Sequence, residues 1–309
     1  MTLKYRTPDK QRLEWAQRVM AEVGDRSPKT QTEVYAREQI LLHEKQQTEI
    51  VVQALRIGEI GIATTPNETY AITGLKIKAA SPLKNTIVIE LANGGDGYIP
   101  PPEQHQFGGY NTWAARSAGL AVNAEPKIAE AAISSLEQVT GKPRRPWELQ
   151  SGEGTKAVLK LKPLAYWRLN EFSGPIAADA SGNHNVAVFE SAITYYLEGP
   201  RAVAFAGQDE INRAPHFVGD RLHAKLPGVK DRYTVSLWVW NGLPSDVRDV
   251  SGWLFSRGPA YGLSAHGDHL GVAGKGPDAN RLLFLRGLGV APAVKGQSTI
   301  PRWDWRHVV

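Results

Sequence analysis

Cysteine is absent from this 309-residue sequence. Its absence excludes disulfide bonds, zinc–thiolate clusters and cysteine nucleophiles, so any metal site must use histidine and oxygen ligands. Long apolar runs are absent as well: no stretch approaches the ~20 residues that cross a bilayer, and we expect no transmembrane segment. Met1 is followed by Thr-Leu-Lys-Tyr-Arg, which has neither the basic start nor the apolar run of a signal peptide.

A concentrated basic surface is also missing, although the net charge is +5. The 36 Lys and Arg residues are scattered, and the densest cluster is Lys142–Pro146, which we interpret as part of a linker. Because no basic stripe is interleaved with aromatic residues, we expect no nucleic-acid partner.

The first 141 residues show a mixed helix and strand pattern. Helices are predicted over 8–24, 31–47, 68–80 and 124–139, and strands over 50–54, 58–64 and 86–91. Asn67 is expected to cap the third helix, which places Glu68 in its first turn. The segment from 58 to 91 reads as a strand–helix–strand unit. In open α/β sheets, functional groups gather beyond the carboxyl ends of the strands, here residues 64–68 and 92–98.

Residues after 155 have short strand signals separated by turns. Strands are predicted over 165–169, 202–205, 233–240, 253–256 and 282–285. Apolar Val235, Leu237 and Val239 alternate with outward-facing residues, which is typical of a sandwich strand. We therefore predict an α/β domain over 1–141, a linker over 142–156 and an all-β domain over 157–309.

Spacing alone leaves the function of the first domain open. Glu68 has an ordinary interpretation as an acid near a helix N-terminus. Asn93–Gly97 is rich in glycine, but no Lys-Ser/Thr pair or helix follows it, which argues against a phosphate loop. Tyr98 and Tyr110 are equally compatible with amphipathic rim positions.

A family resemblance changes this balance. The runs Ala54–Ile62, Pro66-Asn67-Glu68, Ala92–Pro100, Pro102–Gln104 and Gly109-Tyr110 resemble the C-terminal part of the neutral/alkaline ceramidase catalytic domain. The resemblance covers most of residues 30 to 140. It implies a zinc-dependent amidohydrolase that cleaves the N-acyl amide of ceramide-like lipids.

The resemblance assigns roles to three residues. Glu68 matches a glutamate that binds zinc, and Tyr98 matches a tyrosine that is the second late zinc ligand. Tyr110, twelve residues further on, matches a tyrosine near the scissile amide. Gly95 stands where the family has another tyrosine, which puts the substrate in question.

The resemblance also implies what this chain lacks. In the family, two zinc-binding histidines and a serine belong to an upstream region, and neither His43 nor His105 matches them. We therefore expect a fragment that is inactive by itself and binds zinc weakly, with zinc present in the intact parent.

Residues 164 to 309 resemble a laminin G-like, concanavalin A-type sandwich. The resemblance rests on the runs 165–171, 178–183, 202–205, 233–239 and 305–309, and it implies a fold truncated at its C-terminus. Asp179 and Asn183 could offer oxygen atoms to calcium, although such a turn is more often only a turn. His266, Asp268 and His269 are expected to form a polar loop instead of a metal site.

Two functions of different classes follow. The first is the C-terminal part of a ceramidase-like zinc amidase acting on an N-acyl lipid, fused to a recognition module. The alternative is an adhesion module, binding a glycan or a protein, on a degenerate enzyme scaffold. Both resemblances imply an extracellular or cell-envelope location.

Overall fold

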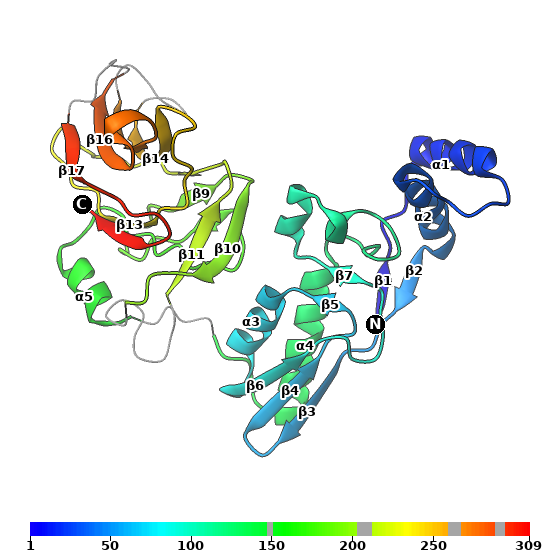
Figure 1. The fold of residues 1–309 in the computed structure, drawn as a ribbon. Helices are drawn as coiled ribbons and strands as arrows, with labels where there is room; N and C mark the ends of the chain where they lie inside the picture. The colour runs from blue at the N-terminus through cyan, green and yellow to red at the C-terminus, as the bar shows by residue number, and fades with distance from the viewer. Residues whose placement is uncertain (147–150, 203–211, 259–266, 288–293) are drawn as a thin grey trace. The chain divides into compact units, whose positions relative to one another are not determined.

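The computed structural model describes residues 1–146, 151–202, 212–258, 267–287 and 294–309. The chain folds into two compact units, Met1–Leu226 and Pro227–Val309, whose elements are labelled in Figure 1. Within the described ranges, no helix has both the length and the apolar character needed to cross a membrane.

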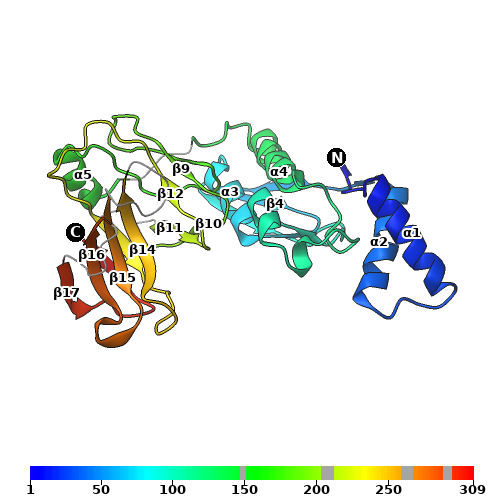
Figure 2. The ribbon, with the colours of Figure 1, turned by 90° about the horizontal axis from the view of Figure 1, so that it is seen from above.

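The first unit begins with two predicted helices that pack on each other (Figure 2). Helix α1 spans Lys10–Val23, and the Asp9 side chain caps it by accepting a hydrogen bond from the Arg12 N–H at 2.7 Å. Helix α2 spans Gln31–Lys45 and starts with a capping box formed by Thr30 and Glu33. A short antiparallel pair of strands, β1 (Thr2–Lys4) and β2 (Gln47–Glu49), flanks the helices in sequence.

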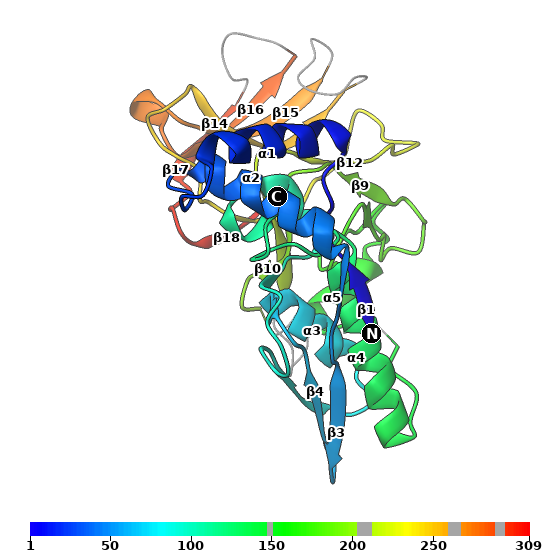
Figure 3. The ribbon, with the colours of Figure 1, turned by 90° about the vertical axis from the view of Figure 1, so that its right-hand side faces the viewer.

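A three-stranded sheet with two helices follows, and it contains the predicted strand–helix–strand unit. Strands β3 (Gln53–Ile57) and β4 (Ile60–Thr64) form an antiparallel hairpin, and β4 pairs in parallel with β6 (Asn85–Ile89). Helix α3 (Ala71–Ala80) connects β4 to β6. Helix α4 (Ala124–Thr140) packs on β3, β4 and α3 (Figure 3) and ends at the left-handed Gly141, as predicted.

The prediction for the start of α3 is wrong. Asn67 is not a helix cap, because α3 begins only at Ala71 with Tyr70 as its N-cap residue. Residues Glu68 and Thr69 instead form strand β5, which pairs in parallel with β7 (Tyr98–Ile99). This pairing satisfies the Glu68 N–H with the Gly97 carbonyl at 3.1 Å, so helix formation there would break an existing hydrogen bond.

Two short 3₁₀ turns, η1 (Pro102–Phe107) and η2 (Tyr110–Thr112), connect β7 to the segment before α4. After α4, part of the predicted linker is bound to the first domain. Arg144 forms ion pairs with Glu130 at 2.7 Å and Glu137 at 2.8 Å, both on α4. Helix α5 (Glu153–Lys160) follows.

The rest of the first unit consists of short strands. Strands β8 (Ile176–Ala177), β9 (Ala187–Phe189) and β12 (Leu222–His223) form one sheet, and β10 (Ile193–Glu198) pairs with β11 (Arg213–Phe217). The strand predicted over 165–169 is wrong: only an isolated bridge joins Trp167 to Asp179. Of the strand predicted over 202–205, residues 203–205 lie outside the described residues.

In the second unit, the described residues form two antiparallel sheets. The strands β14 (Val250–Arg257), β15 (Asp268–Ala273), β16 (Arg281–Arg286) and β17 (Val294–Thr299) form a meander, and the turn η3 (Gly276–Asp278) lies between β15 and β16. Strand β13 (Leu237–Trp240) pairs with β18 (Trp305–Val308). The predictions at 253–256 and 282–285 fall within strands, whereas only the last four residues of 233–240 do. An α/β region is thus followed by a strand-rich region of several small sheets.

Candidate functional site

Glu68 and Tyr98 lie directly opposite each other in the parallel pair β5–β7. Both side chains are half-buried. Tyr110, on η2, packs edge-to-face on Tyr98 with ring centroids 5.6 Å apart, and its side chain is 58% exposed. Strands β5 and β7 thus place Glu68 beside Tyr98, and η2 places Tyr110 against Tyr98. We refer to Glu68, Tyr98 and Tyr110 as the Glu68 cluster.

The electrostatics of the Glu68 cluster centre on a carboxylate beside phenols. The negative charge of Glu68 raises the pKa of Tyr98 above its ordinary value, with burial and the neighbouring Tyr110 adding to the shift. Burial raises the pKa of Tyr70 above its ordinary value, and the neighbouring Tyr98 adds to this increase. The hydrogen bond from Asn111 acts in the opposite direction and lowers the pKa of Tyr70. Tyr98 is therefore a neutral phenol at pH 7, and only a nearby cation would favour its phenolate.

Gly97 fixes the position of Tyr98. Its φ of +77° lies in the left-handed region, and a Cβ placed on it would lie 2.0 Å from the Ser117 carbonyl oxygen. That oxygen accepts the hydrogen bond of the Tyr98 N–H at 2.8 Å. Only glycine fits this close approach without moving the backbone.

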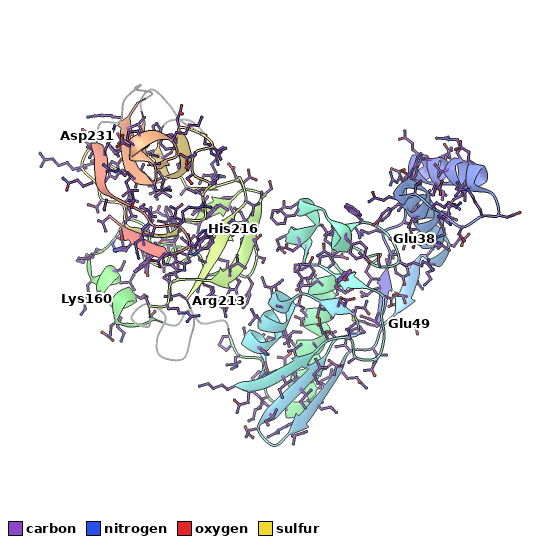
Figure 4. The ribbon with its side chains drawn as sticks, viewed as in Figure 1. Glu38, Glu49, Lys160, Arg213, His216 and Asp231 are labelled. Atoms are coloured by element: carbon purple, nitrogen blue, oxygen red, sulfur yellow. The ribbon has the colours of Figure 1, made fainter. Side chains whose placement is uncertain are left out.

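The segment that carries Ser117 is itself bound to helix α2. Glu38, labelled on α2 in Figure 4, is 4% exposed and accepts hydrogen bonds from the Arg116 backbone N–H at 3.0 Å and from its guanidinium at 2.9 Å. The Gln39 side chain donates to the Ala114 carbonyl at 2.8 Å. The two buried polar side chains of α2 therefore position the backbone against which Tyr98 pairs.

The loop before Tyr98 is anchored from the other side. The Asp96 carboxylate accepts hydrogen bonds from the Tyr5 hydroxyl and, at 3.2 Å, from the Thr48 hydroxyl. Burial and the bond to Asp96 raise the pKa of Tyr5 to about 12. Gly95, the position that departs from the ceramidase pattern, has no heavy atom within 4 Å of a Cβ built on it.

Asn67, next to Glu68, is a residue that the sequence reasoning placed in the wrong role. It is fully buried, and among the described residues neither Oδ1 nor Nδ2 of its side chain has a hydrogen-bond partner. A buried amide without partners costs about 1–3 kcal/mol. The residue with this buried amide directly precedes Glu68 in sequence.

The two histidines of the first domain have other surroundings. His43 is exposed in the last turn of α2, and His105 lies 3.5 Å from the Arg6 guanidinium. Burial and the charge of Arg6 lower the pKa of His105. In the described part of the chain, no three His, Cys, Asp or Glu residues are grouped as metal ligands.

The Glu68 cluster can nevertheless contribute to a zinc site. Glu68 and Tyr98 supply one carboxylate and one phenol oxygen side by side, and Zn²⁺ accepts carboxylate oxygen as a ligand. Two oxygen ligands are half of the tetrahedral set that Zn²⁺ usually takes.

The expected calcium turn is occupied by hydrogen bonds. The Asp179 carboxylate accepts from the backbone N–H groups of Tyr166, Ser181 and Asn185 at 2.8–2.9 Å, and from the Ser181 hydroxyl. Asn183 donates its side-chain amide to the Pro163 and Leu164 carbonyls. These contacts are those of an Asx-type turn; calcium binding here stays a prediction.

Asp268 and His269 do not form the polar loop expected for them, because both lie in strand β15. Asp268 accepts a hydrogen bond from the Tyr233 hydroxyl at 2.7 Å, whereas His269 is buried beside Trp253. His266 lies outside the described residues.

In comparisons with known proteins, no family model matches this chain, and no curated protein or solved structure matches it.

Proposed function

We propose that this chain is the C-terminal part of a zinc-dependent amidohydrolase resembling neutral ceramidase, joined to a laminin G-like sandwich. The single observation that carries the proposal is the register of β5 and β7. It sets Glu68 opposite Tyr98, with Tyr110 packed on the Tyr98 ring. The resemblance assigns Tyr98 and Tyr110, which lie 30 and 42 positions after Glu68 in sequence, to the same site, and their proximity supports the proposal.

In this proposal, Glu68 and Tyr98 hold zinc together with two imidazoles from elsewhere. Bound zinc supplies Lewis-acid polarisation of an amide carbonyl and lowers the pKa of a bound water toward ~7. Tyr98 must lose its proton to bind, and Glu68 would then share the cation instead of repelling the phenolate. Exposed Tyr110 would direct its hydroxyl toward the oxygen that becomes negative in the transition state.

The uncovered face of the β3–β4–β6 sheet supports the view that another layer belongs here. Five aliphatic side chains of this face are at least 40% exposed: Leu55, Ile57, Ile60, Ile87 and Ile89. The opposite face is buried against α4. Because sheets with parallel strands are normally covered on both faces, we propose that the region with the imidazole ligands packs on this aliphatic face.

The test of the metal site uses the full chain and the ultraviolet absorbance of tyrosinate. Adding Zn²⁺ at neutral pH should produce tyrosinate in the wild type at high metal concentration, because the cation lowers the pKa of Tyr98. Tyr98→Phe should abolish the signal, Glu68→Gln should weaken zinc binding, and Tyr110→Phe should retain it. A zinc response that persists in Tyr98→Phe would refute the assignment.

Hydrolysis is the second test. The chain alone should not cleave an N-acylsphingosine. The same protein extended by a region that supplies two histidine ligands should cleave it, and Glu68→Gln should remove both zinc and activity. Such an extended protein that is folded, free of zinc and inactive would contradict the enzyme proposal. The extracellular or envelope location is proposed together with the two resemblances.

A further inference from the structure

A groove in the first unit has three aromatic side chains in its lining. It lies between α1, α2 and the segment that follows η2, and it has a volume of about 460 Å³. Trp15 on α1, Tyr35 on α2 and Trp113 after η2 supply the aromatic surface. We refer to this site as the Trp113 groove. Sites for small molecules have volumes of about 300–1,000 Å³, so the Trp113 groove has the size of such a site.

The wall that carries Trp113 is held in place by contacts with α2. The Trp113 ring packs edge-to-face on Tyr35, with the ring centroids 5.5 Å apart. The next residue, Ala114, accepts a hydrogen bond at 2.8 Å from the side chain of Gln39, which is buried. Trp113 nevertheless remains 41% exposed. A fixed indole with an open face is a stacking surface for a flat ligand.

The opposite wall carries a positive charge. The Arg12 guanidinium lies over the Trp15 ring, 4.2 Å from its centroid. Arg12 is exposed and takes part in none of the ion pairs formed among the described residues. Arg37 on α2 is different, because Glu38 neutralises it at 3.0 Å. A guanidinium stacked on an indole keeps its N–H groups at its edge, where they can donate to a carboxylate.

The charges of the lining favour an anion over a cation. Among the described residues that line the Trp113 groove, Arg12 is the one charged side chain and none is acidic. Burial raises the pKa of Tyr35, and the neighbouring Tyr110 and Glu38 add to the shift. Tyr35 therefore keeps its proton at pH 7 and adds no negative charge.

The remaining polar groups of the lining are few. They are the side chains of Gln31, Thr32 and Gln39, and the amide of Gln39 already donates to the Ala114 carbonyl. A ligand with many hydroxyl groups would leave most of them without partners. The lining suits a ligand with a flat apolar body and a single anionic end, since a few polar groups orient a ligand in a largely apolar site.

We propose that the Trp113 groove binds an aromatic carboxylate. The ring of the ligand stacks on the open face of Trp113, and its carboxylate accepts hydrogen bonds from Arg12. Binding here uses neither zinc nor the residues of the Glu68 cluster. The proposal therefore goes beyond the amidase function and does not depend on it.

The test is a titration of the full chain with three matched probes, followed by NMR of the probe. Naphthoate has a flat ring and a carboxylate, naphthamide keeps the ring without the charge, and decahydronaphthoate keeps the charge without a flat ring. Naphthoate should bind with a Kd of about 1 mM or tighter. The other two probes should each bind at least about tenfold more weakly, and added salt should weaken the binding of naphthoate.

Two variants locate the site. Arg12→Gln should weaken naphthoate binding by about tenfold and leave naphthamide binding unchanged, because only the carboxylate uses the guanidinium. Trp113→Ala should weaken the binding of both probes, because both rings lose their stacking surface. Arg12 and Trp113 are exposed, so both variants should fold, and thermal unfolding checks this.

The matched control is Arg302→Gln in the second unit. The Arg302 guanidinium also lies over an exposed indole, that of Trp303, at 4.5 Å from the ring centroid. The lining of the Trp113 groove is intact in this variant, so it should bind naphthoate like the wild type.

Three outcomes would overturn the proposal. The first is the absence of naphthoate binding at about 1 mM. The second is equal binding of naphthoate and naphthamide by the wild type, which would remove the role of Arg12. The third is naphthoate binding that Arg302→Gln weakens as much as Arg12→Gln does, because the probe would then bind wherever an arginine stacks on an indole. Each of these results leaves zinc binding by the Glu68 cluster untouched.

Discussion

Replacing Gly97 by alanine should disconnect Tyr98 from Glu68 while most of the chain stays folded. The left-handed φ of +77° costs a residue with a Cβ about 1–2 kcal/mol. The added Cβ would also lie 2.0 Å from the Ser117 oxygen, so the backbone must move apart at this point.

That movement would break or weaken two backbone hydrogen bonds. The Tyr98 N–H donates to the Ser117 carbonyl at 2.8 Å, and the Glu68 N–H donates to the Gly97 carbonyl at 3.1 Å. Each contributes about 1 kcal/mol. The expected total loss is therefore about 3–4 kcal/mol, compared with the 5–15 kcal/mol that stabilise typical domains. Folding survives this loss in all but the least stable domains, but the register of β5 and β7 does not.

The assay is urea unfolding together with the zinc-dependent tyrosinate signal. Gly95→Ala is the matched control, because Gly95 lies in the same loop, has no left-handed φ and has open space around its Cβ. It should change stability by less than about 0.5 kcal/mol. If Gly97→Ala and Gly95→Ala unfold at the same urea concentration and give the same zinc response, the close approach to Ser117 does not position Tyr98.

Three further predictions concern the surroundings of the Glu68 cluster. Burial alone would raise the pKa of Glu38, but the hydrogen bonds from Arg116 outweigh it and hold the pKa at about 2, against an ordinary 4.5. A carboxyl with a lowered pKa stabilises the fold above its unfolded pKa, so about 3 kcal/mol should be lost as the pH falls from 4.5 to 2. Unfolding measured against pH should show this slope in the wild type and lose it in Glu38→Gln. Asn67→Leu should raise stability by about 1–3 kcal/mol, because it removes a buried amide without partners among the described residues; a loss of stability in urea unfolding would mean that the amide is bound. Gly95→Tyr should leave stability unchanged within about 0.5 kcal/mol, since open space surrounds this position, and a large drop in melting temperature would contradict that geometry.

Local patterns predicted the regular elements well where one physical rule decided them. Helix α4 has a clean apolar period and the left-handed Gly141 at its end, and both its type and its end were predicted. The alternation of Val235, Leu237 and Val239 also matches their burial, although only part of that segment is a strand. Packing of one face against a core is a property that the chain encodes locally.

The errors arose where tertiary contacts overrode local preference. Asn67 has the chemistry of a helix cap, but β7 pairs with residues 68–69 and delays the helix to Ala71. Residues 165–169 alternate like a strand, yet the Asp179 side chain satisfies the Tyr166 N–H in place of a neighbouring strand. No sequence signal marked Glu38 as buried or pointed to its partner Arg116, which lies 78 residues away.

The sequence by itself offered Glu68, Tyr98 and Tyr110 as candidates only through their resemblance to the ceramidase family, because residue type and spacing alone left their function open. It also determined the exclusion of thiolate chemistry, which follows from composition alone. Only the tertiary structure decided that Glu68 faces Tyr98 in register, that Gly97 permits this approach, and that Trp15, Tyr35 and Trp113 line one groove. The physical reason is that strand pairing and close backbone contact join residues distant in the chain, and their free energy depends on the whole fold instead of on neighbouring residues.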